Sequence, residues 1–154
     1  MDALDQKAVR ALMRQGRTTW AELGKLLDLS APAAAERVHR LEEREIIRGY
    51  TAVADPEALG YPLTAFVWVS LSGEQRRPGF LKGIAKLEEV AECHHVSGDD
   101  DYLLKIRCRS TSDLDRFLVR ELKGRLGAAR TGTTIVLVDR QGKHRGPDSG
   151  KMTH

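Results

Sequence analysis

The chain has 154 residues, of which 41% are hydrophobic and 31% charged, as is typical of a globular protein. No apolar run reaches the ~20 residues that span a bilayer, and the N-terminus lacks the apolar core of a signal peptide. The two cysteines are too few for a disulfide scaffold, so we expect a cytoplasmic protein with no membrane partner.

The formal net charge of +3 is not concentrated in one region of the ordered chain. Residues 1–50 carry 9 basic and 8 acidic side chains, and residues 51–138 carry 12 of each. The remaining excess, 4 basic against 2 acidic residues, lies in residues 139–154. Net charge alone therefore does not indicate DNA binding, which would need a local basic patch.

Residues 1–48 show helical periodicity. A first amphipathic helix is predicted over residues 4–12 and ends near Gly16. Thr19 and Glu22 form the pattern of a capping box that begins a second helix. A short turn follows, and Ser30 is a good N-cap for a third helix that runs to about Arg44. Two helices joined by so short a turn are typical of a helix-turn-helix.

The rest of the chain alternates between strand and helix signals. Residues 46–53 favour a strand, and Pro and Gly then mark a linker. The later segments are strand 63–72, helix 78–87, a hairpin of 90–98 and 101–109 turning at Asp99-Asp100, a helix capped by Ser112, and strand 131–138. This β-α-β-β-α-β order predicts a ferredoxin-like arrangement, and hence an α+β protein.

These elements predict four regions. We expect a helix-turn-helix domain, winged-helix-like, over residues 1–50, a linker over 51–62, a ferredoxin-like domain over 63–139 and a disordered polar tail over 140–154. An isolated ferredoxin-like sheet has open edges, and strand 63–72 is unusually apolar for a strand at such an edge. Edge pairing of two such domains would give a twofold dimer.

One side of the third helix carries arginines. At 100° per residue, Ala33, Arg37, Arg40 and Arg44 fall within a sector of about 60°. An exposed row of guanidinium groups in this position predicts binding to double-stranded DNA. The alternative is an ordinary solvated helix face balanced by glutamates 36, 42 and 43, and spacing alone leaves both open.

The sequence resembles the Lrp/AsnC family of transcriptional regulators. The matching residues are Asp5, Gly16-Arg17, Thr19, Glu22-Leu23, Leu29-Ser30, Arg37-Val38, Arg40-Leu41-Glu42, Ile46-Ile47, Gly49-Tyr50-Thr51-Ala52, Asp55-Pro56, Leu59-Gly60, Glu92-Cys93-His94, Val96-Ser97-Gly98, Asp101-Tyr102-Leu103-Leu104 and Thr131 to Val138. Asp28 and Glu45 stand where the family commonly has Gly, and Asp28 is expected to take the left-handed conformation that ends the second helix.

The resemblance implies a DNA-binding regulator whose second domain oligomerises and binds an effector, usually an amino acid. We expect Ser30, Ala33, Arg37, Arg40 and Arg44 to face DNA. Dimers are expected to associate further into tetramers or octamers.

The segment from Ser97 to Tyr102 is, by the same resemblance, part of the effector region, although glycine and aspartate are also ordinary turn residues. Asp101 or Asp99 would receive the ligand ammonium, and the backbone of Gly98 or the hydroxyls of Thr133 and Thr134 would receive its carboxylate. Tyr102 completes the expected site.

Two other functions are compatible with parts of this pattern. Sirohaem decarboxylase subunits resemble this family, but the regulator pattern Val-Ser-Gly-x-x-Asp-Tyr is intact and no acid/base constellation is evident, so we expect no enzyme activity. An interaction module with a vestigial helix-turn-helix is disfavoured by the retained arginines. The consecutive residues Cys93, His94 and His95 alternate between strand faces, so neither a metal nor a cofactor is expected.

Overall fold

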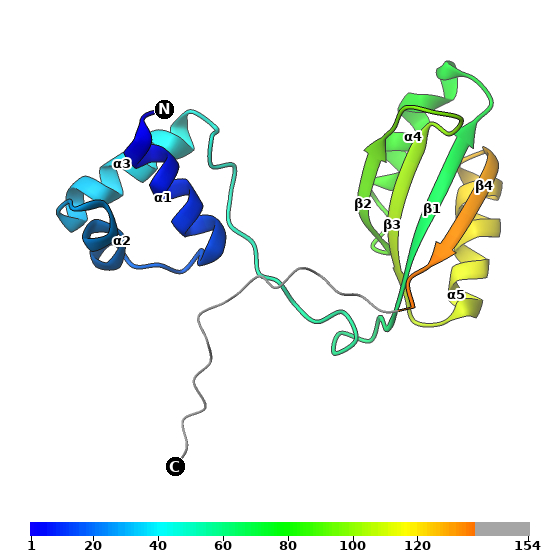
Figure 1. Ribbon diagram of the computed structural model, residues 1–154. Coiled ribbons are helices and arrows are strands. Elements are labelled where there is room, and N and C mark those ends of the chain that lie inside the picture. Colours follow the sequence, from blue (N-terminus) through cyan, green and yellow to red (C-terminus); the bar gives the residue numbers. More distant parts are fainter. Residues whose placement is uncertain (138–154) are drawn as a thin grey trace, which may run out of the picture. The chain divides into compact units, whose positions relative to one another are not determined.

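The computed structural model describes residues 1–137, which divide into two compact units, residues 1–53 and residues 54–137 (Figure 1). The expected polar tail over 140–154 and the last two residues of the expected second domain lie outside the described residues. Within residues 1–137, no helix is long and apolar enough to cross a membrane.

The first unit is built from α1 (Ala3–Arg14), α2 (Trp20–Leu27) and α3 (Ala31–Glu43). Each helix begins at a side-chain cap, because the first backbone N–H groups have no partner within the helix. The predicted capping box of Thr19 with Glu22 is confirmed, and Ser30 accepts the N–H of Ala33 as predicted. The helices enclose a small apolar core of Ala8, Leu12, Leu23, Leu27, Ala34 and Val38.

The turn between α2 and α3 depends on the backbone conformation of Asp28 and on the absence of a side chain at Gly24. Asp28 adopts φ 57°, the left-handed conformation expected where α2 ends. Gly24 lies so close to the turn that a Cβ there would approach the Leu29 carbonyl oxygen to 2.7 Å. These positions allow α3 to pack closely after α2, which gives the predicted helix-turn-helix.

The strand expected over residues 46–53 does not form, so among residues 1–53 there is no wing beside the three helices. Glu45 takes φ 53°, and the N–H groups of Ile46 and Ile47 both bond to the Leu41 carbonyl. The chain therefore turns back at the end of α3, and Ile47 packs on the helical core. Of the β-branched residues in this segment, Ile47 serves this packing, whereas Thr51 and Val53 are exposed.

The second unit is a four-stranded antiparallel sheet with helices on one face (Figure 1). Its elements are β1 (Leu63–Leu71), a 3₁₀ turn (Glu74–Arg76), α4 (Arg77–Ile84), β2 (Val90–His95), β3 (Tyr102–Cys108), α5 (Thr111–Arg116) with its π-helical continuation (Phe117–Arg125), and β4 (Ala128–Ile135). The order β2-β3-β1-β4 confirms the predicted ferredoxin-like α+β fold. Ser110, rather than the expected Ser112, caps α5.

Strand β1 lies in the centre of the sheet, so the expectation that it forms an edge was wrong. Its apolar character follows from two apolar faces. Ala65, Val67 and Val69 are fully buried beneath the helices. Phe66 and Trp68 lie on the opposite face, which no helix among residues 54–137 covers, and we call this the open face.

The loop of the hairpin between β2 and β3 is longer than predicted. His95 pairs with Tyr102, and the N–H of Val96 bonds to the carbonyl of Asp101. The loop therefore contains residues 97–100 instead of only Asp99-Asp100. A polar cluster around Asp101 fixes this wider loop, as described below.

Candidate nucleic-acid interface and effector loop

The exposed side of α3 carries most of the residues expected to face DNA. Ser30 and Ala33 are exposed at its start, and Arg44 is exposed at its end. The Arg40 side chain is 63% exposed, and its Nε lies 3.6 Å from the Glu36 carboxylate. Such exposed ion pairs are weak, so Arg40 can exchange Glu36 for a phosphate or a base edge at little cost.

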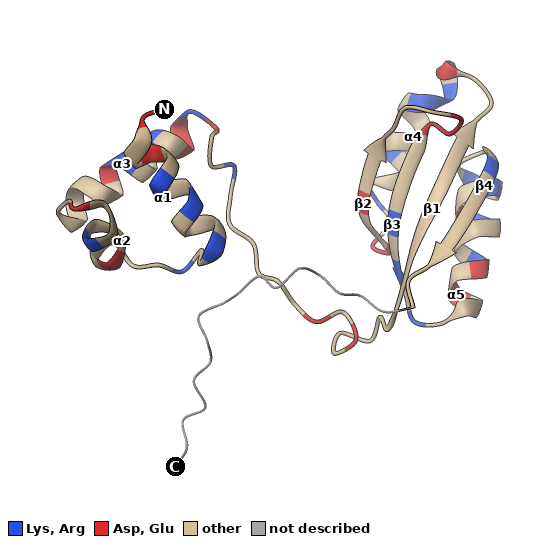
Figure 2. Cartoon of the chain, viewed as in Figure 1, with Lys and Arg blue, Asp and Glu red and all other residues tan. Residues whose placement is uncertain are grey.

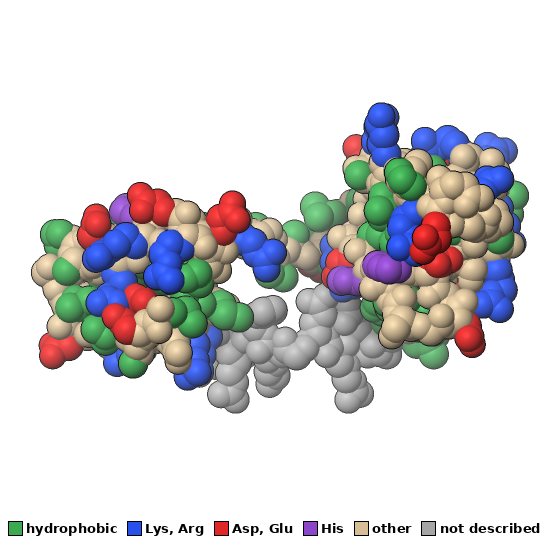
Figure 3. Space-filling model, turned by 90° about the horizontal axis from the view of Figure 1, so that it is seen from above, with side chains coloured by type: hydrophobic (Ala, Val, Ile, Leu, Met, Phe, Trp, Pro, Cys, Tyr) green, Lys and Arg blue, Asp and Glu red, His purple; other side chains and the backbone are tan. Residues whose placement is uncertain are grey.

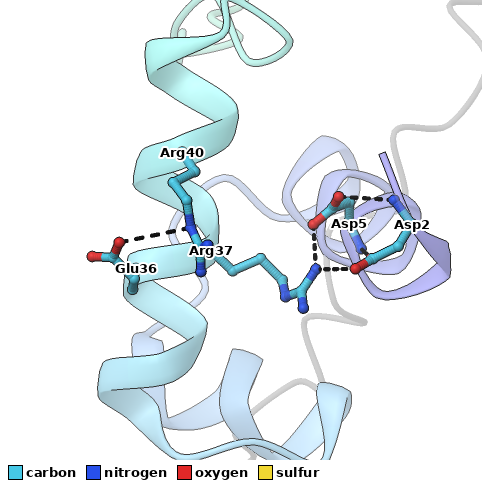
Figure 4. Close-up of polar contacts among 5 residues, drawn as sticks. All are labelled: Asp2, Asp5, Glu36, Arg37 and Arg40. Carbon is cyan, nitrogen blue, oxygen red and sulfur yellow. Dashed lines mark hydrogen bonds and ion pairs between the residues drawn. The ribbon is translucent and has the colours of Figure 1, made fainter.

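Arg37 does not belong to this exposed row, and the expectation of four equivalent positions was wrong here. Its side chain is only 22% exposed, and its Nη1 lies 2.6 Å from the Asp2 carboxylate and also contacts the Asp5 carboxylate. Figure 4 shows the guanidinium reaching away from α3 toward the start of α1. Position 37 borders the buried sector of α3, where Val38 and Leu41 pack, and this places it against α1.

The carboxylates at the start of α1 are held in their ionised form. The N–H of Asp5 and then the Arg37 guanidinium bond to Asp2 and lower its pKa. The N–H of Asp2 and again Arg37 lower the pKa of Asp5 in the same way. The same bonds raise the pKa of Arg37. The cluster is therefore an ionic contact between α1 and α3 at neutral pH.

Charge on the first unit is mixed rather than uniformly basic. Figure 2 shows acidic residues at the start of α1 and basic residues on its later turns. Figure 3 shows basic and acidic side chains interspersed on the face of this unit in view. On this face, binding of a polyanion would depend on a few placed side chains rather than on a broad positive surface.

In the second unit, Asp101 holds the hairpin loop against the end of β1. Its Oδ2 accepts the N–H of Leu71 at 2.7 Å, and its own N–H donates to the Val69 carbonyl at 2.9 Å. Arg77 of α4 lies 3.8 Å from the same carboxylate. The negative charge of Asp101 is thus already matched by groups of the chain itself.

Asp100 has an equally definite environment, which includes a residue that the sequence did not predict. The Ser70 hydroxyl donates to its carboxylate at 2.6 Å, and Arg130 Nη2 lies 3.1 Å from the same oxygen. Arg130 also donates to the Asp99 carbonyl at 3.2 Å. These bonds lower the pKa of Asp100, Ser70 contributing most. The role of Arg130 could be recognised only from the register of β4 against β1, which places Arg130 opposite Ser70.

The remaining expected effector residues do not all meet at this loop. Gly98 and Asp99 are exposed in it. Tyr102 lies in the core, 2% exposed, with its ring centre 5.1 Å from that of Phe80. Burial raises the pKa of its hydroxyl. Its side chain therefore does not line an exposed site.

Thr133 and Thr134 are exposed on β4, but lie further along the sheet. They pair with Val67 and Phe66, whereas the hairpin loop meets β1 from Val69 to Leu71. They are therefore displaced by two or more residues along the sheet from the place where the loop meets β1. Arg130 occupies the place on β4 that these threonines were expected to fill.

No metal site competes with this assignment within residues 1–137, where no group of three or more His, Cys, Asp and Glu side chains is placed to hold an ion. Within residues 1–137, a helix-turn-helix unit is thus followed by a ferredoxin-like unit with a polar loop, which are the two parts expected of a DNA-binding regulator.

Comparison with known proteins identifies the family. Residues 1–42 match the AsnC-type helix-turn-helix domain, and residues 64–146 match the Lrp/AsnC ligand binding domain. The chain is 37% identical over 139 residues to the leucine-responsive regulatory protein of Escherichia coli K12, covering 89% of this chain and 85% of that protein. It is 33% identical over 138 residues to the HTH-type transcriptional regulator FL11 of Pyrococcus horikoshii, covering 89% of each.

Solved structures agree with these relatives. E. coli AsnC has a TM-score of 0.82 at 30% identity, covering 92% of this chain and 95% of that one. The L-Met complex of the Neisseria meningitidis regulator NMB0573 has a TM-score of 0.86 at 29% identity, covering 92% of each chain. The chain belongs to the Lrp/AsnC family and is a DNA-binding transcriptional regulator of that type. This is a family of regulators and not of enzymes, which removes the sirohaem decarboxylase alternative.

Proposed function

We propose that the protein regulates promoters by placing α3 in the major groove, with Ser30, Ala33, Arg40 and Arg44 facing the DNA. The observation that carries this proposal is the exposed Arg40, one turn before the exposed Arg44 on the same side of the helix. Arg37 was expected in this set and is assigned a different role below. Promoter binding requires the compartment that holds the DNA, which supports a cytoplasmic location.

The proposed effector is an amino acid bound at the loop over residues 97–100. The Asp99 side chain is exposed and accepts no hydrogen bond from another group within residues 1–137, so it is the carboxylate suited to an ammonium group. The backbone of Gly98, with φ 123°, and the nearby Arg130 guanidinium are suited to the ligand carboxylate. The L-Met complex of the Neisseria meningitidis relative supports this ligand class.

The open face supports a dimer. Trp68 is 39% exposed and lies opposite Leu103 on the neighbouring strand, with Phe66 two residues along the same strand. Large apolar side chains on a sheet face without a covering layer are typical of a protein interface. We propose that two copies pack these faces together, instead of pairing edges, and that dimers associate into tetramers or octamers.

Hydroxyl-radical footprinting tests the proposal as a whole. The probe is an operator selected by the full-length protein from random-sequence DNA. A twofold dimer should protect backbone segments whose centres lie one or more helical turns apart, ~34 Å each. Protection confined to a single segment would contradict the dimeric arrangement, and the absence of any selected sequence would contradict operator recognition.

A further inference from the structure

The start of α1 forms a capping box that is closed by a residue of α3. Asp2 Oδ1 accepts the N–H of Asp5 at 2.7 Å, and Asp5 Oδ2 accepts the N–H of Asp2 at 2.9 Å. The other carboxylate oxygen of each residue accepts a bond from a single nitrogen, Nη1 of Arg37 (Figure 4). All four carboxylate oxygens are thereby used, and the guanidinium joins α3 to two residues that precede Arg37 by 35 and 32 positions in the sequence.

This ionic cluster of Asp2, Asp5 and Arg37 is partly buried. The Asp5 side chain is 12% exposed and that of Arg37 is 22% exposed, whereas Asp2 is 56% exposed. Charge-assisted bonds with limited exposure are stronger than those of exposed pairs and hold a more definite geometry. For Arg37 to reach a DNA phosphate, both carboxylates would have to lose their partner, and Asp5 would remain nearly buried and unpaired.

The cluster adjoins the arginines that are proposed to contact DNA. Arg40 and Arg44 line the same hollow of about 160 Å³ as Asp2, Asp5 and Arg37, so all five side chains surround one gap between α1 and α3. The directions of Arg40 and Arg44 depend on how α3 is rotated about its axis. Arg37 lies on the same side of the helix, one turn before Arg40, and its anchorage to α1 fixes that rotation.

We propose that Arg37 is a positioning residue of the recognition helix: through Asp2 and Asp5 it sets the orientation of α3, and it contacts neither a base nor a phosphate. The inference rests on the proposed role of α3 in DNA binding. It also makes the first five residues of the chain part of operator recognition, although none of them needs to contact DNA.

The variant Asp5→Asn separates positioning from direct contact, because it keeps every arginine. The amide oxygen of asparagine can still accept the N–H of Asp2, as the Asp5 carboxylate does, but the side chain lacks the charge that holds Arg37. Affinity of the full-length protein would be measured by fluorescence anisotropy on the selected operator and on a shuffled duplex, across a range of salt concentrations. Positioning predicts that operator affinity falls by roughly tenfold, the loss of about one base contact, while affinity for the shuffled duplex stays unchanged.

The salt dependence gives an independent result. A positioning role leaves unchanged the slope of log affinity for the shuffled duplex against log salt concentration, since no phosphate contact is gained or lost. If Arg37 were a DNA contact held back by the carboxylates, its release would raise affinity and steepen that slope by about 0.9. Unchanged affinity on both probes would mean that the cluster serves only the stability of the first unit. Either result would overturn the proposal.

A second pair of variants tests the residue itself. One nitrogen of Arg37 contacts both carboxylates, so an ammonium group can take its place. Arg37→Lys should therefore keep most of the ratio of operator affinity to shuffled-duplex affinity. Arg37→Met, which has no charge, should lose this ratio. A guanidinium that forks onto guanine would not tolerate lysine in this way. Arg10→Ala is the matched control for Arg37→Met: it removes an exposed arginine of α1 that makes no ion pair within residues 1–137, and should leave the ratio unchanged.

Each variant is assayed at a temperature at which its far-UV circular dichroism matches that of the wild type. If Asp5→Asn fails this requirement, Asp2→Asn replaces it with the same expected result, since Asp2 is the more exposed partner. Failure of Arg40→Ala and Arg44→Ala to weaken binding would contradict the proposed function, whereas the outcomes above concern Arg37 alone.

Discussion

The carboxylate of Asp101 accepts the backbone N–H of Leu71 at 2.7 Å and so ties the hairpin loop to the last residue of the central strand. This residue was expected to receive the ammonium of an effector. Its bond to the backbone makes it a support of the loop that is proposed to bind the effector, and Asp99, two residues before it, is left as the exposed carboxylate.

Replacing Asp101 with Ala should destabilise the second unit. The partly buried N–H of Leu71 loses its acceptor, at a cost of about 1–3 kcal/mol in the free energy of unfolding. Urea unfolding followed by the fluorescence of Trp68 in a Trp20→Phe background reports on this unit, because Trp20 lies in the other one. Asp99→Ala is the control and should unfold like the parent; a larger loss there than at Asp101 would contradict the assignment.

Asp99→Asn should weaken effector binding without changing stability. The exposed carboxylate is proposed to pair with the ligand ammonium, and its removal should reduce affinity by roughly tenfold or more. A thermal-shift screen of the common amino acids identifies the ligand, and calorimetry of wild type and variant gives the affinities. Equal affinities would place the ammonium elsewhere, and a screen without any stabilising amino acid would contradict the proposed ligand class.

A charge placed on the open face should dissociate the dimer. Trp68→Asp introduces a carboxylate into the centre of the proposed interface, where it would be desolvated without a partner. Light scattering at micromolar concentration should then report a monomer. Val119→Asp is the control: Val119 is 54% exposed in the π-helical segment, away from that face. An unchanged oligomer for Trp68→Asp would show that another surface joins the protomers.

The ionic contact between α1 and α3 should make the first unit sensitive to acid. The pKa values of Asp2 and Asp5 are lowered in the folded state, so their stabilisation is complete above the unfolded pKa of about 3.9 and is lost as pH falls through the folded values. The doubly substituted variant Asp2→Asn, Asp5→Asn should therefore be less stable than wild type at pH 7 and lose less between about pH 5 and pH 2.

The pKa values of Glu22 and Glu42 are also lowered in the same unit. Both proteins retain these two glutamates, so the difference between the wild type and the double variant reports on Asp2 and Asp5 alone. Unfolding would be followed by the fluorescence of Trp20 in a Trp68→Phe background. Parallel stability curves for the two proteins over this pH range would show that the ionic contact contributes nothing measurable.

The features that were predicted correctly from the sequence depend on neighbouring residues. Thr19 caps α2 with the help of Glu22, three residues away, and the left-handed turn at Asp28 follows from the end of that helix. The ferredoxin-like order of strands and helices also follows from local periodicity. Such signals need no knowledge of tertiary contacts.

The features that were missed depend on residues far apart in the chain. Arg37 faces the start of α1 only because three helices pack together, and its partner Asp2 lies 35 residues away. Arg130 reaches Asp100 through the pairing of β4 with β1, 30 residues from it in sequence. The hairpin register was missed because the loop is fixed by Asp101 bonding to β1, a contact that turn propensities do not encode.

The most direct test of the central claim, that α3 contacts the operator, compares two double variants that each remove two exposed arginines. Arg40→Ala, Arg44→Ala changes α3, and Arg10→Ala, Arg14→Ala changes the outer side of α1 by the same net charge. Operator affinity is measured against salt concentration for both. We expect the α3 variant to lose at least tenfold in affinity and to flatten the slope of log affinity against log salt by up to about 1.8 if both arginines contact phosphates, while the α1 variant matches wild type. Equal losses in the two variants, or a loss confined to the α1 variant, would contradict the placement of α3 on the DNA.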